Sequence, residues 1–288
     1  MKIQQDTKDS YVQLVMKDLL KILTDNREDW IDREFAQKVI NWLEDWNCEF
    51  DRDRFEPSIY TIWEHEFQKL LLQNAGLAEQ ERIAITNHAF FELYYFKLVE
   101  KLARNNETTV DDKLLCLNEY NKGSPKNPCI VNMLLAFNQL EASLKEWFGT
   151  LDNSQWKWGS IHKKTFTYVP WTEIPGVGSL FNRKIPAHGN SRTLNVGIHS
   201  YQKKSFETFA TAIFRFVTDM NRTFYSVDLG VSDRVTSPFY DNFLDDFNNG
   251  KYIEYIMYHP FRDQHNWTLT DSSFPSPNRT QQAADTEL

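Results

Sequence analysis

Residues 155–162 read Gln-Trp-Lys-Trp-Gly-Ser-Ile-His, and the pattern of the whole chain changes at this stretch. Under strand geometry Trp156 and Trp158 fall on one face, because side chains two residues apart point the same way. Gly159 has no side chain, so a neighbouring backbone can approach it closely. We expect a corner between a helix and a strand, in which both indoles pack and His162 forms a hydrogen bond to a backbone carbonyl.

Before this corner, apolar residues recur with a period near 3.6, which predicts helices between Asp9 and Phe148. Asp32 is a plausible N-cap for one of them. Asn127 followed by Pro128 is typical of another helix start, and Gly149 is placed just past the end of that helix. Residues 1–148 are therefore expected to form a helical segment.

After Gly149 apolar and polar residues alternate, as in half-buried strands. We expect one antiparallel sheet with strands near residues 164–169, 191–197, 206–218 and 223–228. A short helix is expected from Pro238 to Asn248. Helices followed by strands indicate an α+β fold in which a β-rich segment, residues 149–260, packs on the helical one. Residues 261–288 are polar and are expected to form a poorly ordered tail.

Composition excludes several classes of function. The chain has 288 residues, a hydrophobic fraction of 41% and a net charge of −8, without a basic stripe, so we expect no nucleic-acid partner. No run approaches eighteen apolar residues, so we expect no membrane span. Three cysteines, at positions 48, 116 and 129, lack metal-ligand spacing, and an odd number leaves at least one unpaired. We expect all three to be small buried apolar side chains.

No self-contained active site is apparent from the residues alone. Ser160, His162 and Asp152 could supply a triad, but no Gly-x-Ser-x-Gly turn positions them. The acidic run from Asp51 to Glu56 lacks the turn glycine of a calcium loop. His65 and His88 lie on different predicted helices, and we expect them to be ordinary core or surface residues. The sequence predicts no metal site and no cofactor.

Trp156-Lys157-Trp158-Gly159-x-x-His162 resembles the Trp-x-Trp-Gly-x-x-His signature in the β-chains of the penicillin acylase (penicillin amidase) family. Other segments resemble the family in the same order, from about residue 4 to about residue 258. They are Gln5-Asp6-Thr7, Leu43–Asn47 with Ile59-Tyr60-x-x-Trp63, Gly189 with Thr193-Leu194-Asn195, Arg215 with Asp219, and Ser237-Pro238-x-Tyr240 leading to Phe247, Gly250 and Tyr252.

The resemblance implies an N-terminal-nucleophile hydrolase, a four-layer αββα protein that hydrolyses amides of acylated small molecules such as penicillins and acyl-homoserine lactones. In this family a serine at the start of its chain attacks the amide, its free α-amino group acts as base, and an asparagine completes the oxyanion hole. The motif residues above would then be mainly structural. The family is usually exported, although Met1–Asp6 lacks the apolar region of a signal peptide, so the compartment stays open.

The chain departs from the family pattern at the nucleophile, because no Ser-Asn dipeptide occurs in it. The segments that hold the nucleophile and the oxyanion asparagine in the family belong before Met1. We therefore expect the C-terminal part of a β-chain, inactive alone, whose partner is the N-terminal part of the same precursor and whose substrate is a small acylated amide. Two alternatives remain. One is a catalytically dead relative, and the other is a ligand- or carbohydrate-binding module with Trp156, Trp158 and Trp171 as a stacking platform.

Overall fold

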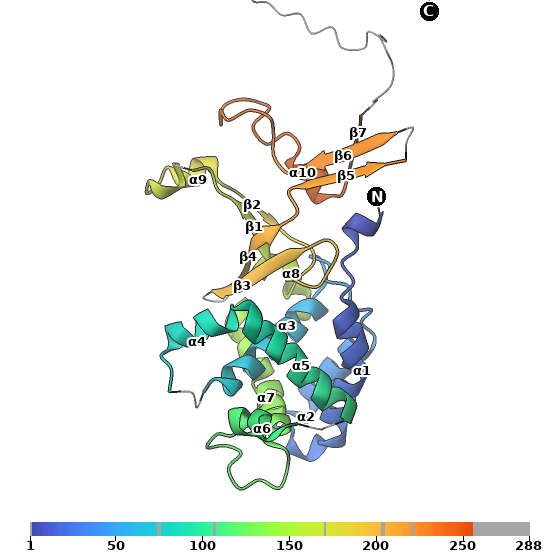
Figure 1. Ribbon diagram of the computed structural model, residues 1–288, viewed down its shortest axis with the longest axis vertical. Coiled ribbons are helices and arrows are strands. Elements are labelled where there is room, and N and C mark those ends of the chain that lie inside the picture. Colours follow the sequence, from blue (N-terminus) through green and yellow to red (C-terminus); the bar gives the residue numbers. More distant parts are fainter. Residues whose placement is uncertain are drawn as a thin grey trace, which may run out of the picture.

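The computed structural model describes residues 2–73, 76–105, 108–169, 171–202, 205–219 and 222–255. The predicted polar tail, 261–288, lies outside these residues. The described part has a helical body, a first sheet beside it and a second sheet farther away (Figure 1). The fold is α+β, as predicted from the order of the two patterns.

Most helices of the body come from the first half of the chain, as the 3.6-residue period predicts. They are α1 (Ser10–Asp25), α2 (Arg33–Glu44), α3 (Glu56–Leu71), α4 (Glu79–Thr86), α5 (Ala89–Asn105), α6 (Val110–Cys116) and α7 (Pro128–Phe148). The predicted caps are confirmed: Asp32 accepts a hydrogen bond from the Phe35 amide at 2.8 Å, and Asn127 accepts one from the Cys129 amide. Gly149 ends α7 with a φ of 74°, a backbone conformation that favours glycine.

The strands form two sheets rather than the single antiparallel sheet expected. The first has the order β2-β1-β4-β3, and the second has the order β5-β6-β7. Their bounds are β1 (Lys163–Phe166), β2 (Arg183–Pro186), β3 (Gly197–Gln202), β4 (Ser205–Thr211), β5 (Phe214–Thr218), β6 (Thr223–Val227) and β7 (Ile253–Tyr255). Because β1 pairs with β4 in parallel, the first sheet is mixed.

Three sequence-based predictions about this half are wrong in detail. Residues 191–196 form turns, and the strand begins only at Gly197. The strand expected over 206–218 is two strands, since the chain leaves the first sheet after Thr211 and enters the second at Phe214. The helix expected from Pro238 is only α10 (Leu244–Asn248). The predicted pairing of 223–228 with its upstream neighbour is confirmed by the β5–β6 hairpin.

The main hydrophobic core lies inside the helical body and reaches the first sheet. It includes Val12, Leu43, Ile62 and Leu140 from the helices and continues to Phe206 of β4. Two short helical segments lie between α7 and the first sheet, η3 (Asn153–Gln155) and α8 (Trp158–Ile161), and a third, α9 (Gly178–Phe181), lies in the connection from β1 to β2. The first sheet is therefore anchored on the helices by a continuous apolar cluster.

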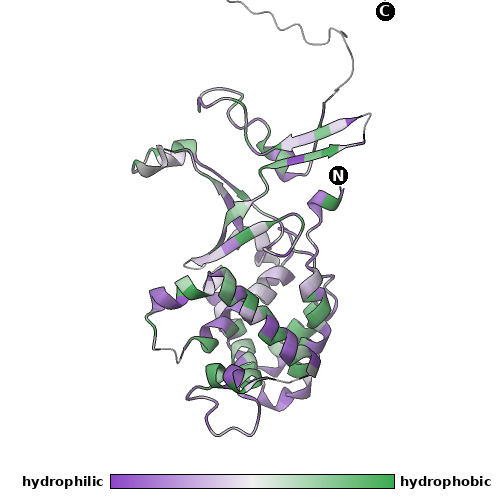
Figure 2. Cartoon of the chain, in the orientation of Figure 1, coloured by the Kyte–Doolittle hydropathy of each residue, from purple (hydrophilic) through white to green (hydrophobic). Residues whose placement is uncertain are grey.

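The second sheet exposes apolar side chains of β5 and buries a charged one. On β5 the side chains of Phe214 and Phe216 are 54% and 47% exposed, whereas Arg215 between them is 6% exposed. The pairing register places Val227 opposite Phe214 and Tyr225 opposite Phe216, and β5 is coloured as hydrophobic along much of its length (Figure 2). Antiparallel strands usually turn apolar side chains toward a core. Within the described ranges, no residue of this sheet joins the main core cluster.

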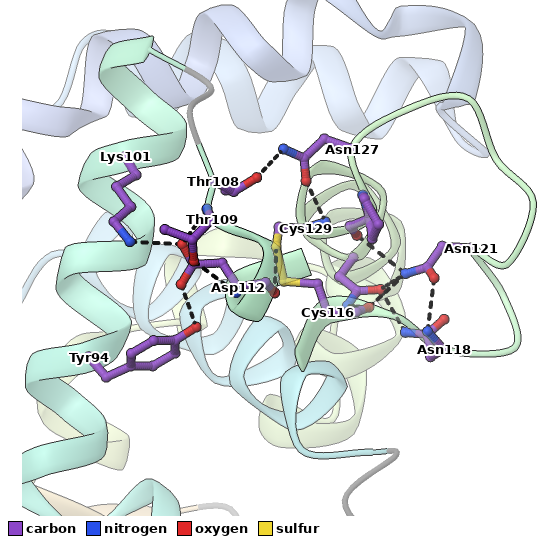
Figure 3. Close-up of a disulfide and its surroundings, with 12 residues drawn as sticks. Tyr94, Lys101, Thr108, Thr109, Asp112, Cys116, Asn118, Asn121, Asn127 and Cys129 are labelled. Atoms are coloured by element: carbon purple, nitrogen blue, oxygen red, sulfur yellow. Dashed lines mark hydrogen bonds and ion pairs between the residues drawn. A yellow bond between two sulfur atoms is a disulfide. The ribbon is translucent and has the colours of Figure 1, made fainter. Parts of the chain in front are cut away.

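All three cysteines are buried and one is unpaired, as expected, but the other two form a disulfide instead of packing as free apolar side chains. Cys116 at the end of α6 is bonded to Cys129 in the first turn of α7, with Cα atoms 4.9 Å apart (Figure 3). Beside it, the buried Asp112 carboxylate accepts hydrogen bonds from Tyr94 and Lys101. Burial opposes ionisation, but hydrogen bonds from Lys101, Thr109 and Tyr94 hold the pKa of Asp112 at about 2. Cys48 is free and buried.

Reduction of this disulfide should destabilise the helical body. The bond closes a loop with a sequence separation of 13, and such a loop constrains the unfolded chain by about 2–3 kcal/mol. We expect dithiothreitol to lower the free energy of unfolding by that amount in urea titrations. A Cys116→Ser, Cys129→Ser double variant should not respond to the reductant. Three alkylatable thiols in the unreduced, unfolded protein would contradict the pairing.

Candidate functional site

The tryptophan stretch forms a buried joint between α7 and the first sheet. Trp156 and Trp158 are both 0% exposed. The Trp156 indole N–H donates to the Thr150 carbonyl at 3.0 Å, and the Trp158 indole N–H donates to the Gly189 carbonyl at 3.0 Å. His162 stacks on Trp158 and bonds through Nδ1 to the Phe206 carbonyl at 2.8 Å. The predicted packing corner and its histidine bond are confirmed, although Trp158 begins the short helix α8 rather than a strand.

Gly159 is required at this joint because neighbouring atoms lie too close to leave room for a side chain. A Cβ atom there would lie 2.7 Å from the Pro186 Cβ and 2.9 Å from the Arg52 Cβ. The Gly159 amide donates to the Arg52 carbonyl at 2.8 Å, which brings the loop before α3 against α8. Because both indoles are buried, the stacking platform proposed for Trp156, Trp158 and Trp171 is wrong. Only Trp171 is exposed, at 42%, and it stacks on Phe181.

The Gly189–Asn195 segment ties the N-terminal residues to the joint. The Gly189 amide donates to the Phe50 carbonyl at 2.7 Å, and the Asn195 amide donates to the Asp6 carbonyl at 2.8 Å. Thr193 holds the turn, since its hydroxyl accepts from the Asn190 amide at 3.0 Å and donates to the Asn195 carbonyl at 3.0 Å. Motif segments far apart in sequence therefore meet here.

Arg215 extends the same network into the second sheet. Its guanidinium donates to the Asn195 side-chain oxygen at 3.1 Å and to the Phe247 carbonyl at 2.9 Å, above the Phe247 ring. Asp219 lies at the β5–β6 turn, where its carboxylate accepts from the Arg222 amide. Pro238 is in a turn, and the buried Tyr240 donates its hydroxyl to the Phe181 carbonyl at 2.6 Å. The bonds of Arg215 and Tyr240 thus join separate segments of the fold, whereas that of Asp219 stays within its own turn.

A charged cluster lies beside this network and was not foreseen from the sequence. Arg192 contacts the Asp9 carboxylate at 2.6 Å and the Glu64 carboxylate at 3.5 Å. Asp9 is 0% exposed, caps α1 and also accepts from Asn190 at 2.7 Å. Burial raises the pKa of Glu64 to about 7, and Arg192 only partly opposes this. A carboxyl group that is half-protonated near neutral pH is typical of functional sites.

Glu64 lines a cleft of about 380 Å³ between the helical body and the β3–β4 pair. His65 and His199 also line it, and burial lowers their pKa values to about 3 and about 4, so both imidazoles are neutral. Thr61 Oγ1, His65 Nε2 and His199 Nδ1 are buried without a hydrogen-bond partner in the described part of the chain, and Glu64 Oε1 has the ion pair with Arg192 at 3.5 Å but no hydrogen bond. Within the described ranges, the cleft thus gathers several buried polar atoms that lack hydrogen bonds.

The structure does not bring together the residues of the possible catalytic triad or of the possible calcium loop. The Ser160 hydroxyl donates to the Lys157 carbonyl at 2.6 Å on the surface, whereas His162 is fully buried. Asp152 caps the next turn through the Ser154 amide. In the acidic loop, Glu56 pairs with Arg54. Among the described residues no His, Cys, Asp and Glu side chains cluster as they would around a metal ion.

The sequence model of the family described as penicillin amidase matches residues 1–262. The chain belongs to the penicillin amidase family. The resemblance seen in the tryptophan stretch is thereby confirmed over most of the chain. A comparison with curated proteins found no match. No helix in the described ranges is long and apolar enough to cross a membrane.

Membership in the penicillin amidase family gives the motif residues a shared context. Trp158, Gly189, Asn195 and Arg215 form one connected chain of hydrogen bonds and packing contacts. The Gln5 side chain reaches the Gly250 carbonyl, which adds the first and last matched motifs to the same region. We predict that these residues serve the architecture of the family rather than its chemistry. The sequence pattern did not reveal Glu64 or Arg192, because neither stands in a recognisable motif.

Proposed function

We propose that this chain is the C-terminal part of a penicillin acylase-like amidohydrolase, acting on amides of acylated small molecules such as penicillins or acyl-homoserine lactones. The family match over residues 1–262 carries the proposal. The chemistry of the family needs a serine with a free α-amino group and an oxyanion asparagine. No segment of this sequence matches the family pattern at those two positions, so another part of the precursor would supply them.

The second sheet supports a role within a larger assembly. Its outward face carries Phe214, Phe216 and Tyr255, which are exposed by 54%, 47% and 56%. The strand register brings Tyr225 and Ile253 onto this face as well. Exposed apolar surface of this kind is typical of a contact with another chain or segment. We propose that the N-terminal part of the precursor covers this face.

The 288-residue chain alone should be inactive toward amides. We expect no turnover of phenylacetyl, penicillin or acyl-homoserine lactone amides above a buffer blank, since nucleophile and oxyanion donor act together and the loss of one already removes most catalysis. We also expect the intact mass to show no self-cleavage. Activity that persists through purification and disappears in Ser160→Ala or His162→Ala would contradict the proposal. The matched control is Ser154→Ala, at a surface turn.

A further inference from the structure

The cleft beside Glu64 has no role in the proposed hydrolysis, yet its lining holds several buried polar atoms without a hydrogen-bond partner among the described residues. Thr61, Glu64 and His65 lie on one face of α3, because residues three and four apart on a helix are neighbours. Thr61 and His65 are 3% and 5% exposed, and both line the cleft. Buried polar atoms are nearly always hydrogen-bonded in native proteins. Several unpartnered atoms around one cavity therefore indicate a polar ligand. An ionised Glu64 can only accept hydrogen bonds, and Thr61 Oγ1 and His65 Nε2 can also accept them, so a donating ligand satisfies all three.

The charges around the cleft favour a cation. Arg192 is the sole cationic side chain among the described lining residues, and Asp9 already neutralises it at 2.6 Å. Glu64 and Glu92 add two carboxyl groups, of which Glu92 accepts a hydrogen bond from Ser191. Neither His65 nor His199 carries a charge near neutral pH, because burial lowers both pKa values. The cleft therefore has an excess of acceptors and of negative charge.

The remaining wall is partly apolar and also carries polar side chains such as Gln68 and Asn87. Phe96, Ile198, Phe206 and Phe209 line it, and the volume of about 380 Å³ suits a small organic molecule. A primary ammonium group has three hydrogen-bond donors and no acceptor, which complements Thr61 Oγ1, Glu64 Oε1 and His65 Nε2. We propose that this cleft is a binding site for a primary ammonium ion attached to an apolar chain. The site is independent of the amidase activity proposed above.

The test is calorimetric titration of the full chain at pH 8 with n-hexylammonium chloride. 1-Hexanol and hexanoate have the same apolar chain without the positive charge. We expect hexylammonium to bind at least about tenfold more tightly than either, because charge-assisted hydrogen bonds are the stronger ones. Equal affinity for hexanol, or no binding of hexylammonium, would overturn the proposal and leave an unspecific apolar cavity.

Two variants test whether the side-chain oxygens of Glu64 and Thr61 bind the ammonium group. Glu64→Gln keeps the shape of the side chain but removes its charge, and should weaken hexylammonium binding about tenfold. Thr61→Val removes one acceptor at nearly constant volume and should weaken it less. Glu34→Gln is the matched control, since this carboxylate is 82% exposed on α2 and pairs with Lys38. If Glu64→Gln failed to fold by circular dichroism, unchanged affinity in Thr61→Val would still refute the proposed site.

Discussion

Replacing Trp158 by alanine should lower the free energy of unfolding by about 3–5 kcal/mol, the usual cost of deleting a fully buried aromatic side chain. The indole is 0% exposed and packs on Phe50, His162 and Phe206. Its N–H is also bonded to the Gly189 carbonyl, which would lose this partner. Chemical denaturation of both proteins measures the difference directly.

Trp171→Ala is the matched control for this variant. Trp171 is 42% exposed and stacks on Phe181, so its removal leaves little cavity and should cost much less. Trp158→Phe should fall between the two, because it retains most of the packing but loses the hydrogen bond. A change below about 1 kcal/mol in Trp158→Ala would show that this residue does not hold the joint together.

The helical half could be predicted because its signals are local. Asp32 and Asn127 are capping residues placed directly before apolar periodic stretches, and both cap the helices expected of them. The buried tryptophan joint could also be predicted, since Gly159 next to Trp158 implies close packing. The chemistry of these positions depends on neighbours within a few residues, which the sequence displays directly.

The sheets were harder to predict because alternation alone does not say which strand pairs with which. Residues 192–196 alternate like a strand, but Thr193 and Asn190 bond the backbone locally and form a turn instead. Residues 206–218 are rich in residues that favour strands, although the chain changes sheets at Ala212 and Ile213. The parallel β1–β4 pairing depends on the path of the intervening chain.

The charged cleft could not be predicted at all. Arg192 and Asp9 are 183 residues apart in sequence and meet only in the fold. Glu64 is one of many acidic residues, and nothing around it in the sequence indicates burial of its carboxyl group. The Cys116–Cys129 bond was missed for a related reason, because a separation of 13 residues permits pairing without requiring it.

The titration of Glu64 should make the stability of the protein depend on pH. Burial raises its pKa from the usual 4.5 to about 7 in the folded chain. Between these values the folded state holds a proton that the unfolded state has released, so stability falls as pH rises. A difference of this size corresponds to about 3 kcal/mol, retained below about pH 4.5 and lost above about pH 7. Glu64→Gln should therefore resemble the wild type at pH 4.5 and be about 3 kcal/mol more stable at pH 8.

Other ionisable groups around Glu64 are present in both proteins. They are Asp9, Tyr11, Tyr60, Glu92, Tyr95 and Arg192. The pKa values of the tyrosine neighbours and of Arg192 are raised, so those groups keep one protonation state between pH 4.5 and pH 8. Gln68→Ala provides the control, because it changes a cleft residue that has no ionisable group and keeps Glu64. Its difference from the wild type should not vary with pH. The contrary result is a difference between Glu64→Gln and the wild type that is the same at pH 4.5 and pH 8 in urea titrations. It would show that Glu64 ionises normally and that burial in the cleft does not raise its pKa.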